Sequence, residues 1–412
     1  MHPSLLSIQD FTYALPESRI AAFPLSDRDA SKLLVYQRGS ITEDSFRHLP
    51  DRLPANCRLL LNNTRVLEAR LLFQKPSGGV IEIFCLEPAG DVSNLASAIN
   101  AHHSAHWKCL IGGASKWKKG MVLEKQIHDS SSEYILRAAI SERAADYFVI
   151  AFEWTSTEKS FAEVLHDAGA IPLPPYIKRA TEPSDRERYQ TVYAHFEGSV
   201  AAPTAGLHFT PAVFAALEKK NIPVDFLTLH VGAGTFKPVK SSTMAGHDMH
   251  TEFIEADVAL LESMVAGTPN IYCVGTTSMR SVESLYWMGV KLIANPNLPA
   301  SQLPISQWEV YDENIPKQVS LRDAFNALIE WMKKKEMKRL ISRTAILIAP
   351  GYQPRVARGL ITNFHQPQST LLLLVAACIG DDWKKVYEFA LAHDFRFLSY
   401  GDACLLNFGD GY

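Results

Sequence analysis

The strongest constraint on this chain is a change of hydrophobic pattern near residues 70 and 150. Between Leu71 and Ile150, short β-rich runs such as Val80–Leu86 alternate with Gly-, Ser- and Pro-containing segments. Short, closely spaced strands of this kind are typical of an all-β sandwich or barrel. After Trp154 the predicted strands alternate with predicted helices, which is typical of an α/β domain.

We therefore predict an α/β (mixed α+β) main domain of residues 1–65 and 151–412, interrupted by a small all-β barrel of residues 66–150. A length of 412 residues agrees with two to three domains. Two further segments, 90–106 and 293–342, are expected to be a loop and an insertion. Thr210-Pro211 predicts a helix start, and the apolar run Thr344–Ala349 predicts a strand.

Composition excludes several classes of protein. With 47% hydrophobic and 21% charged residues, the chain is neither disordered nor of low complexity. A net charge of -3 excludes nucleic-acid binding through bulk charge, although a local basic patch remains possible. The six cysteines form no C-x-x-C pair, so neither a zinc knuckle nor a redox dithiol is indicated. The longest apolar run, Leu371–Ile379, is about half of what a bilayer requires, and no signal peptide is visible. We expect a cytoplasmic protein without a membrane partner.

Two segments rich in glycine or histidine are candidates for ligand binding. Leu229–Phe236 follows a predicted strand, and its glycines would let backbone N–H groups approach an anion, although a tight turn without a ligand explains it equally well. The segment His247–Glu252 is densely polar. Its residues suit acid–base work or hydrogen bonding to a substrate, a metal site, or a solvated loop.

Three further groups of residues suggest binding functions. Val274–Arg280 lies at a strand-to-helix junction, where free N–H groups suit an anion; with Glu283 it also fits a capping box. Basic residues between 178 and 188 precede a segment with two tyrosines, Tyr189–Tyr193. This pattern suits an RNA strand, although a solvated charged face explains it more simply. Polar clusters at Asn62–Arg65, Thr362–His365 and Arg396–Asp402 complete the set.

The motifs together resemble those of the S-adenosylmethionine:tRNA ribosyltransferase-isomerase family of queuosine biosynthesis. They occur in one order along nearly the whole chain: Asn62–Leu71, Tyr189–Ala194, Val200–Phe209, His230–Val239, His247–Glu252, Val274–Arg280, Ile361–Thr370 and Phe395–Asp402. The sequence departs from the family pattern at Asn63, where an Asp is usual, at Gln366, where a Leu is usual, and near Gln353-Pro354.

The resemblance implies an α/β main domain with an inserted small β-barrel, in agreement with the hydrophobic pattern. It also implies transfer and isomerisation of the ribosyl unit of S-adenosylmethionine. The acceptor is 7-aminomethyl-7-deazaguanine (preQ1) at the wobble position of tRNA, and the products are epoxyqueuosine, adenine and methionine. The sulfonium makes the ribose C5′ hydrogen acidic, so that one positioned base can start the reaction without a metal.

On this resemblance we assign candidate roles to individual residues. The acid–base candidates are His247, His250, Glu252 and His208. The candidates for holding S-adenosylmethionine are His230, Gly232, Gly234, Thr235, Thr276, Thr277 and Ser278. The candidates for contacting tRNA or its base are Arg65, Lys178, Arg179, Arg188, Tyr189, Gln190, Tyr193, Arg280, Asn363, His365, Arg396 and Tyr400. We expect a monomer without a metal. The alternatives are a metal-dependent hydrolase built on His247, His250 and Glu252, and a non-catalytic tRNA-binding homologue.

Overall fold

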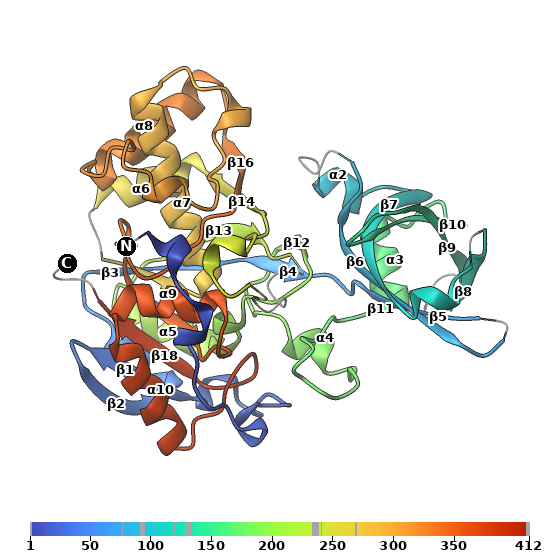
Figure 1. The fold of residues 1–412 in the computed structure, drawn as a ribbon, viewed down its shortest axis with the longest axis horizontal. Helices are drawn as coiled ribbons and strands as arrows, with labels where there is room; N and C mark the ends of the chain where they lie inside the picture. The colour runs from blue at the N-terminus through green and yellow to red at the C-terminus, as the bar shows by residue number, and fades with distance from the viewer. Residues whose placement is uncertain are drawn as a thin grey trace.

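The computed structural model describes residues 2–75, 77–90, 95–118, 120–128, 133–232, 239, 241–267 and 270–408. These residues form a main body with a nine-stranded mixed sheet and a smaller unit with a seven-stranded antiparallel sheet (Figure 1). The predicted mixed α/β class with a curled all-β unit is confirmed. Among the described residues no helix is both long and apolar enough to cross a membrane.

The large sheet has the strand order β16-β14-β13-β3-β15-β17-β18-β1-β2. Its strands are β1 (Lys32–Gln37), β2 (Ser40–Ser45), β3 (Cys57–Asn62), β13 (Val224–His230), β14 (Glu252–Asp257), β15 (Asn270–Val274), β16 (Arg339–Thr344), β17 (Ala357–Asn363) and β18 (Ala403–Asn407). The four central strands β13, β3, β15 and β17 run parallel. Their carboxyl ends therefore meet at one edge, where a ligand site is commonly found in open α/β sheets.

Helices cover both faces of this sheet. The alternation of side chains along a strand places Leu60 in the core shared with α7 (Thr276–Ala294), α9 (Thr370–Ile379) and α10 (Asp382–Ala392). Leu59 and Leu61 face the opposite core, shared with α1 (Leu49–Arg52) and α5 (Pro211–Lys219). Because α7 is buried over most of its length, it is the central helix of the main body.

The segment 293–342, expected to be an insertion, packs into the main core. Its helix α8 (Leu321–Lys334) lies on α7 and on α6 (Val258–Ala266). The approach of α8 to α7 is so close that a Cβ on Gly289 would lie 2.0 Å from the carbonyl oxygen of Ala324. The chain then continues into β16, an edge strand of the large sheet.

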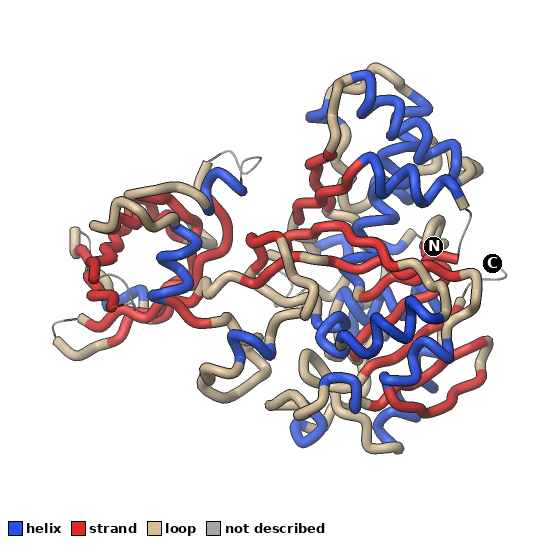
Figure 2. Tube along the Cα trace, turned by 180° about the vertical axis from the view of Figure 1, so that it is seen from behind, coloured by secondary structure: helices blue, strands red, loops and turns tan. Residues whose placement is uncertain are grey.

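The small unit has its own core. Its strands are β5 (Arg70–Gln74), β6 (Val80–Pro88), β7 (Ser104–Gly112), β8 (Val122–His128), β9 (Glu133–Arg143), β10 (Phe148–Trp154) and β11 (Gly169–Ala170), in the order β11-β5-β6-β7-β10-β9-β8. The sheet curls around helix α3 (Phe161–Ala168), as Figure 2 shows from behind. The side chains of Trp107, Phe152 and Phe161 lie in one apolar cluster. The boundary expected at residue 150 thus falls inside β10, and α3 and β11 belong to this unit.

Two short elements lie near the junction of the bodies. Strand β4 (Thr64–Val66) pairs in parallel with β12 (Phe196–Ser199), and a short helix α4 (Asp185–Arg188) follows the proline segment 171–176. Within the predicted loop 90–106, residues Leu95–Ile99 form helix α2 and β7 begins at Ser104, whereas residues 91–94 lie outside the described residues.

Candidate functional site

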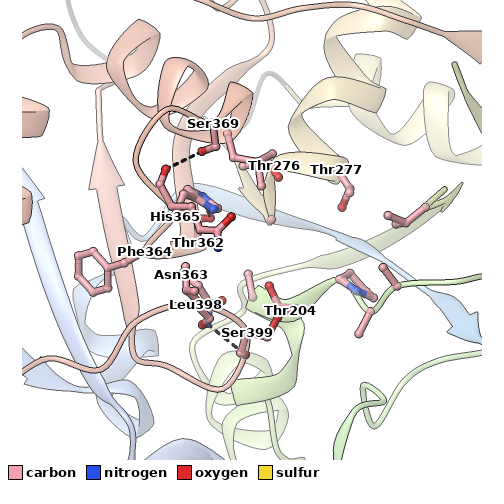
Figure 3. A pocket seen from close by; sticks show the side chains of 18 of the residues that line it. Thr204, Thr276, Thr277, Thr362, Asn363, Phe364, His365, Ser369, Leu398 and Ser399 are labelled. Atoms are coloured by element: carbon pink, nitrogen blue, oxygen red, sulfur yellow. Dashed lines mark hydrogen bonds between the residues drawn. The ribbon is translucent and has the colours of Figure 1, made fainter. Parts of the chain in front are cut away.

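A pocket opens at the carboxyl ends of β15 and β17, beside the first turn of α7 (Figure 3). It holds about 780 Å³ of space, part of it open to solvent. The polar residues that line it are Tyr176, Tyr189, Thr204, Thr276, Thr277, Thr362, Asn363, His365, Gln366, Ser369 and Ser399. Five of these were sequence-based candidates, and the structure brings them together: Tyr189, Thr276, Thr277, Asn363 and His365.

The N-terminus of α7 forms one wall of the pocket. Gly275 precedes the helix with a φ of +87°, a conformation that L side chains rarely adopt. Thr276 and Thr277 stand in the first turn, and the Oγ1 atom of Thr277 is buried without a hydrogen-bond partner in the described part of the chain. Ser278 instead donates its hydroxyl to the carbonyl of Val274 at 2.7 Å. The free N–H groups of such a turn favour an anionic ligand.

A buried chain of polar groups forms the opposite wall. Asn363 donates through Nδ2 to the Leu398 carbonyl at 3.0 Å and lies 3.3 Å from Nε2 of His208. Nδ1 of His208 lies 2.8 Å from the hydroxyl of Ser31. If Asn363 donates to Nε2, the proton of His208 resides on Nδ1 and points at Ser31. Burial lowers the pKa of His208 to about 4, so the ring is neutral at pH 7. The Oδ1 atom of Asn363 is buried and, among the described residues, has no donor.

His365 contributes a second neutral imidazole. Its Nε2 lies 2.9 Å from the hydroxyl of Thr362, and its backbone N–H donates to the hydroxyl of Tyr387 at 3.0 Å. Burial lowers the pKa of His365 to about 3. A neutral ring held in this way can accept a hydrogen bond or a proton from a ligand, according to its tautomer.

Tyrosines close the pocket near the proline segment. The hydroxyl of Tyr176 lies 2.7 Å from that of Ser399, and Tyr189 is fully buried beside them. Tyr400 does not line the pocket; it donates to Asp185 at 2.8 Å. Arg179 binds the same carboxylate through two hydrogen bonds of 2.7 Å. Arg179 and Tyr400 therefore do not contact the pocket but hold in place, through Asp185, the segment that carries Tyr176 and Tyr189.

The predicted acid–base residues form a second cluster, next to the pocket. Nε2 of His250 lies 3.2 Å from one oxygen of Glu252, and Arg280 binds the other oxygen. Burial raises the pKa of Glu252, but Arg280 and His250 outweigh it and lower this pKa to about 2. His250 borders Gly232, and Arg280 lies one turn of α7 beyond Thr276 and Thr277. Glu252 is thus an ionised group that orients His250.

The other residues predicted for acid–base chemistry or for binding S-adenosylmethionine do not line the pocket or lie outside the described residues. His247 is half-buried and its carbonyl accepts a 2.7 Å hydrogen bond from Gln307; burial lowers its pKa, assisted by His250. His230 is buried between Glu255, at 3.1 Å, and Thr64, at 3.5 Å. Gly234 and Thr235 lie outside the described residues. No three His, Cys, Asp or Glu side chains are grouped to hold a metal within the described part of the chain.

Most of the residues predicted to contact RNA are engaged inside the protein. Arg280 is 4% exposed and paired with Glu252, so its contact with RNA stays a prediction. Gln190 binds both the N–H and the carbonyl of Val66, at 3.0 and 2.7 Å. Tyr193 packs against Phe209, Phe214 and Phe226.

The remaining RNA candidates lie nearer the surface. Arg65 and Lys178 are exposed and sit beside Glu197 and Glu17, at 3.9 and 2.7 Å. Arg396 binds Asp402 at 3.1 Å. Arg188 donates to the backbone carbonyls of Leu25 and Ser26, the latter at 2.9 Å.

The sequence analysis did not identify Glu283 as the residue that binds the start of β17 to α7. The capping-box interpretation is wrong, because Glu283 lies in the middle of α7 and is 0% exposed. It accepts hydrogen bonds from the hydroxyl of Tyr352 and from the backbone N–H groups of Arg355, Val356 and Ala357. A lone carboxylate among the apolar residues of α7 is the signal that could have revealed this role.

Comparisons with known proteins agree with the sequence motifs. Residues 8–406 match the family described as "Queuosine biosynthesis protein". Among solved structures, the chain is similar to an S-adenosylmethionine tRNA ribosyltransferase from Thermotoga maritima, with 26% sequence identity and a TM-score of 0.44. That match covers 96% of this chain and 99% of the other.

Proposed function

The chain belongs to the queuosine biosynthesis protein family, and from this premise we propose that it is a tRNA ribosyltransferase-isomerase. It transfers the ribosyl unit of S-adenosylmethionine to the aminomethyl group of preQ1 at the tRNA wobble position and isomerises it. The products are epoxyqueuosine-containing tRNA, adenine and methionine. We propose that it acts as a monomer in the cytoplasm.

The observation that carries the proposal is the pocket between α7 and β17. The N-terminus of α7 suits a carboxylate such as that of the methionyl group, and the hydroxyl of Thr277 there has no hydrogen-bond partner among the described residues. The buried Oδ1 of Asn363 needs an N–H donor, which the amino group of a purine-like base supplies. The rings of Tyr176 and Tyr189 lie in the same pocket, and aromatic faces attract a cationic sulfonium.

Acid–base chemistry is assigned to His250. When bound, S-adenosylmethionine supplies an acidic hydrogen at C5′ beside its sulfonium. His250 is 25% exposed at its side chain, so it can reach a ligand, while Glu252 fixes the ring from the buried side. A base oriented by a carboxylate is a common catalytic arrangement. Glu252 itself acts as a positioning residue, because both of its oxygens are already bonded.

The histidines on the pocket wall have a supporting role. His208 and His365 are neutral at pH 7 because burial lowers their pKa values. A neutral imidazole can accept a hydrogen bond from the aminomethyl group of the acceptor base, which an imidazolium cannot do. Of the residues predicted to contact the tRNA, Arg65 and Lys178 are exposed enough to bind its phosphates.

The experiment is to measure adenine release from S-adenosylmethionine with tRNA that carries preQ1 and with the same tRNA carrying guanine. We expect adenine and methionine only with preQ1. Absence of release with intact tRNA binding would contradict the proposal and favour a non-catalytic binding protein. Stoichiometric zinc in pure protein, with hydrolysis that chelators abolish, would instead favour the metal-dependent hydrolase.

A further inference from the structure

A second, smaller pocket of about 290 Å³ lies behind the polar wall of the first. Its polar lining comes from Arg28, Ser31, Arg188, His208, Arg396 and Tyr400, and Ser399 lines both pockets. His208 faces this smaller pocket, whereas its hydrogen-bond partner Asn363 faces the larger one. A single layer of side chains thus separates the two spaces.

Three guanidinium groups, those of Arg28, Arg188 and Arg396, line the smaller pocket. Arg28 donates to the backbone carbonyls of Gln190 and Glu187, at 2.6 and 2.8 Å, and Arg188 donates to those of Ser26 and Leu25. Carbonyls are neutral, so these hydrogen bonds fix the guanidinium groups without cancelling their charge. In the described part of the chain neither arginine forms a salt bridge, and no Asp or Glu lines the pocket. Arg396 alone pairs with a carboxylate, that of Asp402.

The arrangement has an electrostatic consequence. Burial and the neighbouring charge of Arg188 lower the pKa of Arg28, and the charge of Glu187 partly opposes this shift. Guanidinium groups nevertheless remain protonated in proteins, so their mutual repulsion persists. The Nε atom of Arg188 is also buried without a partner among the described residues. An anion with several oxygens would satisfy that donor and offset the repulsion.

We propose that this pocket binds a phosphodiester group of the substrate RNA, next to the nucleotide that reacts in the larger pocket. Planar guanidinium forks match the oxygens of a phosphate, and the pocket is too small for a base pair or a protein segment. Consecutive parts of one nucleotide chain can occupy both pockets because the pockets share Ser399 and the hydrogen-bonded residues His208 and Asn363 line one each. The RNA origin of the phosphate rests on the proposed function, and free phosphate has the same chemistry.

The first measurement is the affinity of the protein for a fluorescent anticodon stem–loop RNA, by anisotropy, as a function of KCl concentration. Losing one phosphate contact should reduce the slope of log K against log salt by about 0.7. We expect that reduction, with several-fold weaker binding, in Arg188→Gln. Arg188→Lys keeps the charge and should keep the slope. Arg322→Gln removes an exposed guanidinium from α8 and should behave as the wild type.

The second measurement locates the phosphate. Each loop phosphate of the RNA is replaced in turn by a neutral methylphosphonate. One position should weaken binding to the wild type and have no additional effect in Arg188→Gln, since both changes remove the same contact. Fully additive effects at every position, or equal salt slopes for the wild type and Arg188→Gln, would overturn the proposal.

Free phosphate is tested separately. If inorganic phosphate raises the thermal midpoint of the wild type but not of Arg188→Gln, and no methylphosphonate position couples to Arg188, the ligand is free phosphate and the RNA assignment is wrong. These measurements report binding alone. Coupling between Arg188 and one RNA phosphate without adenine release would therefore support the subsite and refute the proposed activity.

Discussion

Replacing Glu283 by glutamine tests how α7 and β17 are held together. The two carboxylate oxygens accept four hydrogen bonds: 2.9 and 3.0 Å from the N–H groups of Val356 and Ala357 to one oxygen, 2.6 and 2.9 Å from Tyr352 and Arg355 to the other. Glutamine has the same shape but one acceptor oxygen. Two of the donors therefore lose their acceptor and meet an NH2 group instead.

The magnitude follows from these contacts. A hydrogen bond to a charged group contributes about 1.5–3 kcal/mol, so losing two lowers the free energy of unfolding by about 3–6 kcal/mol. Most of the effect should appear as a lower midpoint in urea, followed by tryptophan fluorescence. The matched control is Glu262→Gln on α6, whose exposed carboxylate pairs with Lys333. Such a surface pair is worth about 0–1 kcal/mol.

The variant also tests the connection to the pocket. Ala357 begins β17, the strand that ends in Thr362 and Asn363. If Glu283→Gln displaces the start of β17, it should weaken binding of S-adenosylmethionine, whereas Glu262→Gln should leave that binding unchanged. A loss of stability below about 1 kcal/mol in Glu283→Gln would refute the idea that the carboxylate accepts all four donors.

Three other changes give separate tests. His250→Ala should lower turnover by about 10²–10⁴-fold while changing the Kd for S-adenosylmethionine much less, and an equal loss of both would exclude the acid–base role. Because the pKa of His208 is lowered to about 4, protonation favours the unfolded state as pH falls below about 6.5. The fall in unfolding free energy from pH 7 to pH 5 should therefore be about 2 kcal/mol smaller in His208→Gln; identical pH profiles would contradict the burial argument. Gly289→Ala should lower stability by about 1–3 kcal/mol because its methyl group meets the Ala324 carbonyl, and an unchanged urea midpoint would show that α8 shifts freely.

Features set by local chemistry were predictable from the sequence. Thr210-Pro211 predicted a helix start, and α5 begins at Pro211 with the Thr210 hydroxyl accepting a hydrogen bond from the Val213 N–H. The change of hydrophobic pattern near residues 70 and 150 predicted the all-β unit. Short consecutive strands and strands that alternate with helices have different hydrophobic patterns, and a short stretch of sequence is enough to distinguish them. The position of its boundary was harder to predict, since residue 150 lies within the apolar part of β10, Phe148–Phe152.

Features that depend on distant partners were not predictable. The strand expected over Thr344–Ala349 is wrong: β16 ends at Thr344, and the apolar residues after it are buried without joining the sheet. The N–H of Ala345 donates instead to the carbonyl of Ile305 at 2.8 Å, and that of Ala349 to the hydroxyl of Tyr311 at 3.2 Å. A hydrophobic run alone does not distinguish these partners from a neighbouring strand.

The candidate site shows the same division. Sequence motifs identified Thr276, Thr277, Asn363 and His365, which now line one pocket. They did not show that Arg280 of α7 turns inward, because its partner Glu252 lies on strand β14 and the pairing exists only after the helix has packed on the sheet. The fold, and not the separation along the sequence, determines which buried carboxylate pairs with which guanidinium.

The pairing of β1 with β18 has a consequence for how the protein is made. Leu33 lies opposite Ala403, so the large sheet pairs two strands that are far apart in the sequence. The small unit, by contrast, is one continuous stretch from β5 to β11, with its own core. During synthesis it can fold as soon as Ala170 has left the ribosome, while β1 waits for the final strand. The small unit can therefore be folded before the main body is complete, and premature termination before β18 would leave β1 without its parallel neighbour.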